Sequence, residues 1–135
     1  MTPERDAPAR VHGAVPVTKA GEGPVPTRWR PVLGAVVDAL VRRDYGLRAG
    51  IDGVAPVSAD SAEHIRRYIE DYGATLVPLP QEAWDTSVCS WTGHHWDVMV
   101  DLWTEEEGSS DLVLQMRVVE QDEGYLAEVH MVYVP

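Results

Sequence analysis

Hydrophobic and polar residues alternate from Trp96 to Val119, which predicts two long β-strands joined by an acidic turn. Successive side chains of a strand point to opposite faces, so each arm has one wholly apolar face. That face holds Trp96, Val98, Val100 and Leu102 in the first arm and Leu112, Leu114, Met116 and Val118 in the second. The mixed face holds Asp97, Met99, Asp101 and Trp103 in the first arm and Val113, Gln115, Arg117 and Val119 in the second. The pattern predicts an antiparallel sheet with one face on a core and the other toward water or a partner.

Apolar residues at spacings of three and four predict two helices before this sheet. The first begins near Arg30 and Pro31, because proline is tolerated at the first helical position. Its apolar stripe is Val32, Leu33, Val36, Val37, Leu40 and Val41. The second starts at Asp60, which has capping-box spacing to Glu63, and ends at Gly73.

Three further segments complete the domain. Residues 46–58 are rich in glycine and predict a loop, and residues 84–91 are a candidate strand followed by a turn at 92–95. The final strand, residues 125–134, alternates Ala127, Val129, Met131 and Tyr133 against Glu128, His130 and Val132. Helices followed by strands indicate an α+β domain over residues 30–135. We expect two helices packed on a twisted antiparallel meander of about four strands.

Residues 1–29 contain five prolines and the run GEGPVP. This composition predicts an extended or disordered arm with no core of its own. An alternative is that the arm folds back and covers the apolar part of the mixed face.

Charge is distributed unevenly along the 135 residues, whose net charge is −11. Acidic and basic residues cancel over residues 1–79, whereas Arg117 is the one Lys or Arg after residue 79. The excess negative charge therefore lies on the half that forms the sheet. It disfavours nucleic acid, whose phosphates require Arg and Lys, and it favours a basic protein partner, a cation or simple solubility.

Cellular location is indicated by cysteine content and hydropathy. A single cysteine, Cys89, allows no internal disulfide and fits a reducing cytoplasm. No apolar run approaches the roughly 20 residues of a membrane span, and the N-terminus does not resemble a secretory signal. We therefore expect a cytoplasmic protein that does not bind a membrane.

Two groups of residues are candidates for chemistry. The turn TEEEGSSD (104–111) is rich in carboxylates, but its spacing differs from that of a calcium-binding loop, so we expect no metal and no cofactor. His130 lies on the same predicted face as Asp101 and is a candidate acid–base partner for it, provided that this face lines a cleft. Otherwise the chain shows no catalytic motif.

A binding surface is the better supported expectation. Trp103 and Met99 lie on the mixed face within a ring of carboxylates, which is the composition of a protein interface. The expected partner-binding residues are Asp97, Met99, Asp101, Trp103, Glu105 and Glu106.

The stretch from Trp96 to Leu112 fits the pattern W-x-V-x-V-D-L-W-T-x-E-E-G-x-S-D-L. With EDYGATLVPLP before it and VYVP at the end, it resembles an uncharacterised family of small bacterial proteins over roughly residues 30–135. The resemblance implies a domain and no particular activity. The order of elements is also similar to that of cystatin-like and NTF2-like folds, in which helices wrap a curved sheet.

These observations support three hypotheses. The leading one is a non-enzymatic binding protein, immunity-like or antitoxin-like, whose acidic sheet face holds a basic protein. The second is an NTF2-like domain that binds a small molecule or uses His130 and Asp101 in catalysis. The third is a structural domain that associates with itself.

Overall fold

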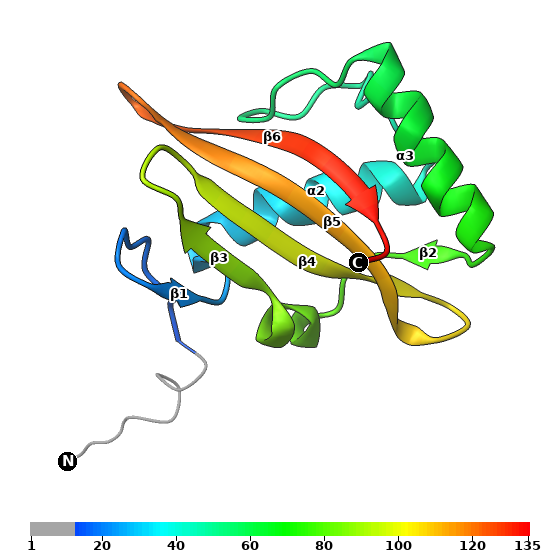
Figure 1. Cartoon of the computed structure of the whole chain (residues 1–135), viewed down its shortest axis with the longest axis horizontal. Coiled ribbons are helices and arrows are strands. Elements are labelled where there is room, and N and C mark those ends of the chain that lie inside the picture. Colours follow the sequence, from blue (N-terminus) through cyan, green and yellow to red (C-terminus); the bar gives the residue numbers. More distant parts are fainter. Residues whose placement is uncertain (1–12) are drawn as a thin grey trace.

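The computed structural model describes residues 13–135 and shows an open antiparallel sheet with helices on one side (Figure 1). The helices are η1 (Thr27–Trp29), α2 (Arg30–Val41), α3 (Ala59–Tyr72) and η2 (Gln81–Thr86), of which η1 and η2 are 3-10 helices. The strands are β1 (Glu22–Gly23), β2 (Leu76–Val77), β3 (Val88–Trp91), β4 (Trp96–Thr104), β5 (Gly108–Gln121) and β6 (Gly124–Tyr133). The mixture of helices and antiparallel sheet confirms the predicted α+β class.

The sheet has the order β1-β3-β4-β5-β6, with β2 paired to β4 beside this path. The expected meander is confirmed as β3, β4, β5 and β6. The sheet has six strands and not the expected four, because two short strands of two residues each, β1 and β2, join it. The strand predicted over residues 84–91 starts only at Val88, since η2 occupies the preceding residues and buries Trp84.

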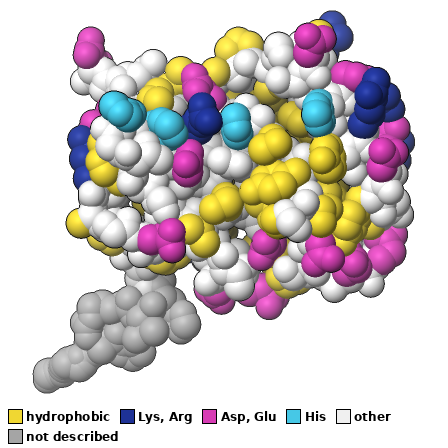
Figure 2. All heavy atoms as spheres, viewed as in Figure 1, with side chains coloured by type: hydrophobic (Ala, Val, Ile, Leu, Met, Phe, Trp, Pro, Cys, Tyr) yellow, Lys and Arg dark blue, Asp and Glu magenta, His cyan; other side chains and the backbone are white. Residues whose placement is uncertain are grey.

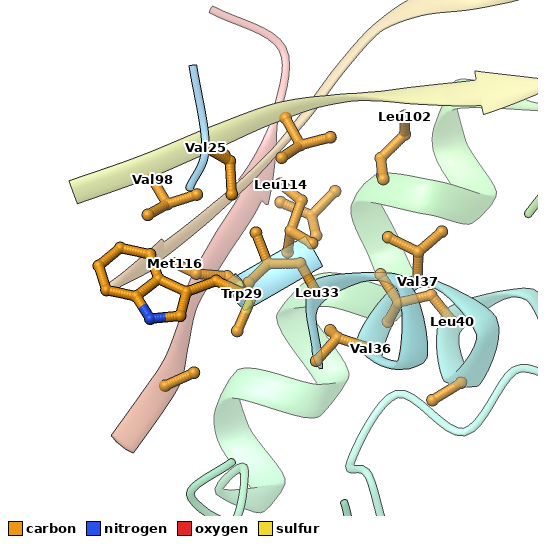
Figure 3. Close-up of a cluster of buried hydrophobic side chains, with 14 of the residues drawn as sticks. Val25, Trp29, Leu33, Val36, Val37, Leu40, Val98, Leu102, Leu114 and Met116 are labelled. Atoms are coloured by element: carbon orange, nitrogen blue, oxygen red, sulfur yellow. The ribbon is translucent and has the colours of Figure 1, made fainter. Parts of the chain in front are cut away.

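The apolar faces of β4 and β5 form the core, as predicted. Every residue assigned to those faces has at most 1% of its surface exposed. Helix α2 lies behind the sheet and packs Leu33, Val36 and Val37 against it (Figures 1 and 3). Trp29 and Trp96 meet edge to face, with ring centres 5.1 Å apart. Helix α3 packs beside β6 and contributes Ile65 and Ile69 to the same core.

Both helices begin and end close to the predicted residues. Helix α2 starts at Arg30, with Pro31 in its first turn. Helix α3 is capped by Ser58, whose Oγ accepts a hydrogen bond from the backbone N–H of Ser61 at 3.1 Å, so the assignment of Asp60 as the cap was wrong. Gly73 ends α3 with φ of 82°, a left-handed conformation that glycine adopts without strain.

The N-terminal segment contributes to the core from Val17 onward. Strand β1 pairs with β3, and Val25 is completely buried, with its N–H donated to Ser87 Oγ at 3.0 Å. The indole N–H of Trp96 donates to the carbonyl of Thr18 at 2.8 Å. Residues 17–29, which the sequence assigns to an extended arm with no core of its own, therefore pack against the core of the domain. Residues 1–12 of that arm lie outside the described residues.

Candidate functional site

A bulge in β6 determines which side chains face away from the helices. Gln115 pairs with Met131 and the next residue, Met116, pairs with Val129, so His130 is an extra residue in β6. One extra residue reverses the alternation that follows it. The predicted faces of Met131, Val132 and Tyr133 were consequently wrong. Val132 is 1% exposed in the core, and the other two join the open face.

The open face of the sheet carries a contiguous apolar patch, which we define as Met99, Trp103, Val113, Met131 and Tyr133. Pairing across the strands brings these residues together: Met99 and Met131 flank Gln115 on either side, and Val113 lies between Asp101 and Tyr133. The hydroxyl of Tyr133 donates to the sulfur of Met99 at 3.8 Å. Figure 2 shows hydrophobic side chains gathered on this face.

Trp103 lies at the end of the patch nearest the β4–β5 turn. A Cβ at Gly108 would lie 3.4 Å from the Trp103 ring, and Gly108 has φ of 76°, so glycine both forms the turn and lies against the indole. The indole nitrogen of Trp103 is buried and has no hydrogen-bond partner among residues 13–135. The ring itself is half-buried and available to a partner.

Carboxylates border the patch on the side of η2 and of the β4–β5 turn (Figure 2). Asp101 accepts a hydrogen bond from Thr86 Oγ1 at 3.1 Å, which orients its carboxylate beside the patch. Glu105, Asp111 and Asp85 are exposed, and no hydrogen bond or ion pair engages their side chains within the described part of the chain. The border thus presents fixed negative charge next to an apolar surface.

Glu106, a predicted binding residue, makes hydrogen bonds within the chain. Its carboxylate accepts hydrogen bonds from the backbone N–H of Thr75 at 2.9 Å and from Thr75 Oγ1 at 3.1 Å. The backbone hydrogen bond lowers the pKa of Glu106 below its ordinary value. Beside it, Glu107 accepts from the Tyr72 hydroxyl at 2.7 Å. The acidic turn is therefore hydrogen-bonded to the last residue of α3, Tyr72, and to Thr75 after it.

The S-D-L part of the motif also has a structural explanation. Between Asp101 and Trp103 the pairing of β4 with β5 shifts, because β5 contains additional residues there. Ser110 is buried in this irregularity and donates its hydroxyl to the carbonyl of Leu102 at 2.7 Å. The same oxygen accepts the N–H of Leu112 at 3.2 Å. Ser110 therefore replaces ladder hydrogen bonds that the shift interrupts.

Asp97, another predicted binding residue, lies away from this border beside His95 and Arg117. His95 Nε2 is 3.0 Å from the Asp97 carboxylate, and Arg117 Nε is 3.9 Å from the same oxygen. Arg117 also stands opposite Glu128 across the β5–β6 pair. Arg117 partly neutralises Asp97, so Asp97 contributes little to a negative surface.

The structure does not bring His130 and Asp101 together. Asp101 is on β4 and His130 is on β6, so strand β5 separates them by about 10 Å. His130 borders a surface hollow of 210 Å³ with Asp60 and His64 of α3. Among residues 13–135, no group of three or more His, Cys, Asp and Glu side chains is arranged to hold a metal ion. No described helix is both long enough and apolar enough to cross a membrane.

Comparison with known proteins assigns the chain to a family. No curated protein and no solved structure matches it. Residues 37–135 match the family described as "Domain of unknown function (DUF7668)", and this range includes α3, the whole β4–β5 hairpin and the open-face patch. The match covers most of the chain and agrees with the expected membership of an uncharacterised family. The chain therefore belongs to the DUF7668 family.

Proposed function

We propose that this protein is a non-enzymatic interaction protein whose open sheet face binds a basic protein. The observation that supports this proposal is the apolar patch around Trp103, which is bordered by carboxylates and partly exposed at Met99, Trp103, Met131 and Tyr133. An aromatic anchor within a charged rim is the usual composition of an interface centre. An immunity-like or antitoxin-like role fits this chemistry, because the acidic face would block a basic protein.

The residues proposed to bind the partner differ from those expected from the sequence by three additions and two removals. Met99, Asp101, Trp103 and Glu105 remain in the proposed surface, and Asp111, Met131 and Tyr133 join it. Glu106 leaves it because Thr75 occupies its carboxylate. Asp97 leaves it because His95 and Arg117 lie beside it.

Charge favours a basic partner over a second copy of the chain. All of the excess charge of −11 lies after residue 79, on the part of the chain that carries the open face. Two copies packed through this face would place their acidic borders near each other, which is unfavourable at low ionic strength. A basic partner gains from the same border, and its diffusional encounter is accelerated.

A capture experiment tests the proposal. The immobilised protein is exposed at low salt to an extract of its native cells, alongside two variants of equal net charge. Glu105→Lys/Asp111→Lys reverses the border of the patch, and Asp122→Lys/Glu123→Lys reverses exposed acids of the β5–β6 turn. We expect a basic protein to be retained by wild type and by the turn variant and lost by the border variant. Retention of the same proteins by all three would show that the acidic border does not contribute to binding and only favours solubility.

The anchor role of Trp103 requires its own variant. Trp103→Ala should raise the dissociation rate of the captured protein by about ten- to thirty-fold, which is typical of a central aromatic residue. Met131→Ala is a second variant that keeps the packing against Gly108 intact. Sedimentation of the free protein is the control for self-association. A stable dimer that Trp103→Ala dissociates would show that the open face binds a second copy of the chain and not a basic partner.

A further inference from the structure

A cavity of 190 Å³ lies on the core side of the sheet, away from the open face. It is formed where η1 and the start of α2 meet the β5–β6 hairpin and the loop before α3. Its wall consists of Arg28, Trp29, Val32, Leu33, Gly53, Val118, Gly124, Tyr125 and Ala127. Leu33 and Val118 are at most 1% exposed, so the cavity reaches the core. A concave hollow that opens at the surface and reaches buried core residues is a candidate site for a small ligand.

The wall residue Trp29 has an unsatisfied hydrogen-bond donor. Trp29 is 5% exposed, and its indole nitrogen has no partner among residues 13–135. Trp29 lines the cavity together with Tyr125 and Ala127 of β6. The neighbouring Trp96 differs, since its indole N–H donates to Thr18. Buried tryptophan N–H groups normally have a hydrogen-bond acceptor. The unpaired N–H of Trp29 therefore indicates that a ligand would supply the acceptor.

Arg28 adds a second donor at the exposed side of the cavity. Its guanidinium lies over the Tyr125 ring, 5.2 Å from the ring centre, and no carboxylate within the described range 13–135 forms an ion pair with it. The remaining side chains of the wall are aliphatic or aromatic apart from the Tyr125 hydroxyl, and Gly53 and Gly124 contribute backbone. The side chains of the cavity therefore offer donors at one end and apolar surface elsewhere.

We propose that this cavity binds a small, largely apolar molecule that presents one oxygen acceptor, a carboxylate or a carbonyl, to Arg28 and Trp29. An apolar cavity of about 150 Å³ accommodates benzene, so 190 Å³ suits a ligand of roughly six to ten non-hydrogen atoms. Arg28 favours a carboxylate, whereas the acidic turn beside Gly124 favours a neutral carbonyl. The site is on the opposite side of the sheet from the open face and does not depend on the proposed protein partner.

Nuclear magnetic resonance of the full chain tests the proposal with three probes of similar size. Benzoate carries a carboxylate, acetophenone carries a neutral carbonyl, and ethylbenzene has no acceptor. The five tryptophans give separate indole N–H signals, and Trp29→Phe identifies the one that belongs to Trp29. We expect benzoate or acetophenone to shift that signal saturably, with a dissociation constant of about 0.1–10 mM. Ethylbenzene should bind at least about five-fold more weakly.

Matched variants locate the binding. Ala127→Val fills part of the cavity and should weaken the better probe at least about five-fold, whereas Ala20→Val adds the same atoms at an exposed position and should not. Where Ala127→Val fails to fold, Val118→Ile provides the cavity-filling test. Arg28→Gln should weaken benzoate about three- to five-fold and leave acetophenone unchanged, with Arg42→Gln as the charge control.

Two results would overturn the proposal. The first is the absence of any saturable shift of the Trp29 signal with benzoate and acetophenone at up to about 20 mM, twice the upper end of the expected range of dissociation constants. The second is ethylbenzene binding as tightly as both other probes, because the acceptor would then be irrelevant. Equal affinity of wild type and a folded cavity-filling variant would place the binding elsewhere and would likewise exclude this cavity.

Discussion

Ser110→Ala tests the role that the structure gives to the S-D-L segment of β5. The hydroxyl of Ser110 satisfies the carbonyl of Leu102 and the N–H of Leu112, both of which belong to residues with 0% exposure. Alanine at this position leaves both backbone groups without that partner and opens no space for bulk water. A buried backbone group that loses its hydrogen bond costs about 1–3 kcal/mol; with each group taken at the lower end, about 1–1.5 kcal/mol, the two together predict a loss of about 2–3 kcal/mol.

Urea denaturation followed by tryptophan fluorescence measures this loss. The midpoint should fall while the m-value stays unchanged, because the change does not alter the surface exposed on unfolding. For a domain of 135 residues the loss corresponds to a Tm decrease of about 7–12 °C. Ser109→Ala, one residue away on the exposed side, is the matched control and should change stability by less than about 0.5 kcal/mol. Equal, small effects of both substitutions would refute the assigned role of Ser110.

Further predictions concern acid stability, the N-terminal segment and the buried thiol. Because the pKa of Glu106 is lowered in the folded state, its hydrogen bonds to Thr75 contribute stability in full above the ordinary pKa of 4.5, and this contribution is lost as pH falls through the folded-state value. In Glu106→Gln the pH dependence of the unfolding free energy should therefore flatten at its acidic end. Unchanged curves would contradict the role of the Glu106–Thr75 hydrogen bonds. Val25→Ala should cost about 2–3 kcal/mol because Val25 is 0% exposed, against less than about 1 kcal/mol for the half-buried Val17→Ala, as measured by denaturation. Burial raises the pKa of Cys89 to about 11, so iodoacetamide should label the native protein far more slowly at pH 8 than the unfolded chain, and equal rates would show that the thiol is accessible.

The sequence predicted the faces of β4 and β5 because strict alternation directly reports which side chains share a face. It failed in β6, where a single extra residue, His130, reverses the phase without leaving a gap in the pattern. Val129 and Val132, three positions apart, were the available sign of that reversal. A bulge is a local irregularity of the ladder, and periodicity alone does not locate it.

Long-range contacts account for the remaining differences. Glu106 has the composition of an exposed binding residue, and its partner Thr75 lies 31 positions earlier in the chain. Val25 stands among prolines that predict an arm, yet Ser87 accepts its N–H 62 positions later. Neither contact follows from local pattern, since each depends on how distant segments meet in the fold. Trp103 and Met99 were identified correctly as neighbours on one face, because that relation is local to a single strand.

The central claim is that the acidic border of the Trp103 patch attracts a basic protein, and association kinetics test it most directly. The rate constant for binding of the captured basic protein should be measured at ionic strengths from about 0.02 to 0.5 M, over which the Debye length falls from about 20 Å to about 4 Å. We expect the wild-type rate to fall at least about ten-fold across this range and the rate of Glu105→Lys/Asp111→Lys to be low and nearly independent of salt. The turn variant Asp122→Lys/Glu123→Lys should keep most of the wild-type dependence. Identical salt dependence in wild type and the border variant would contradict the claim.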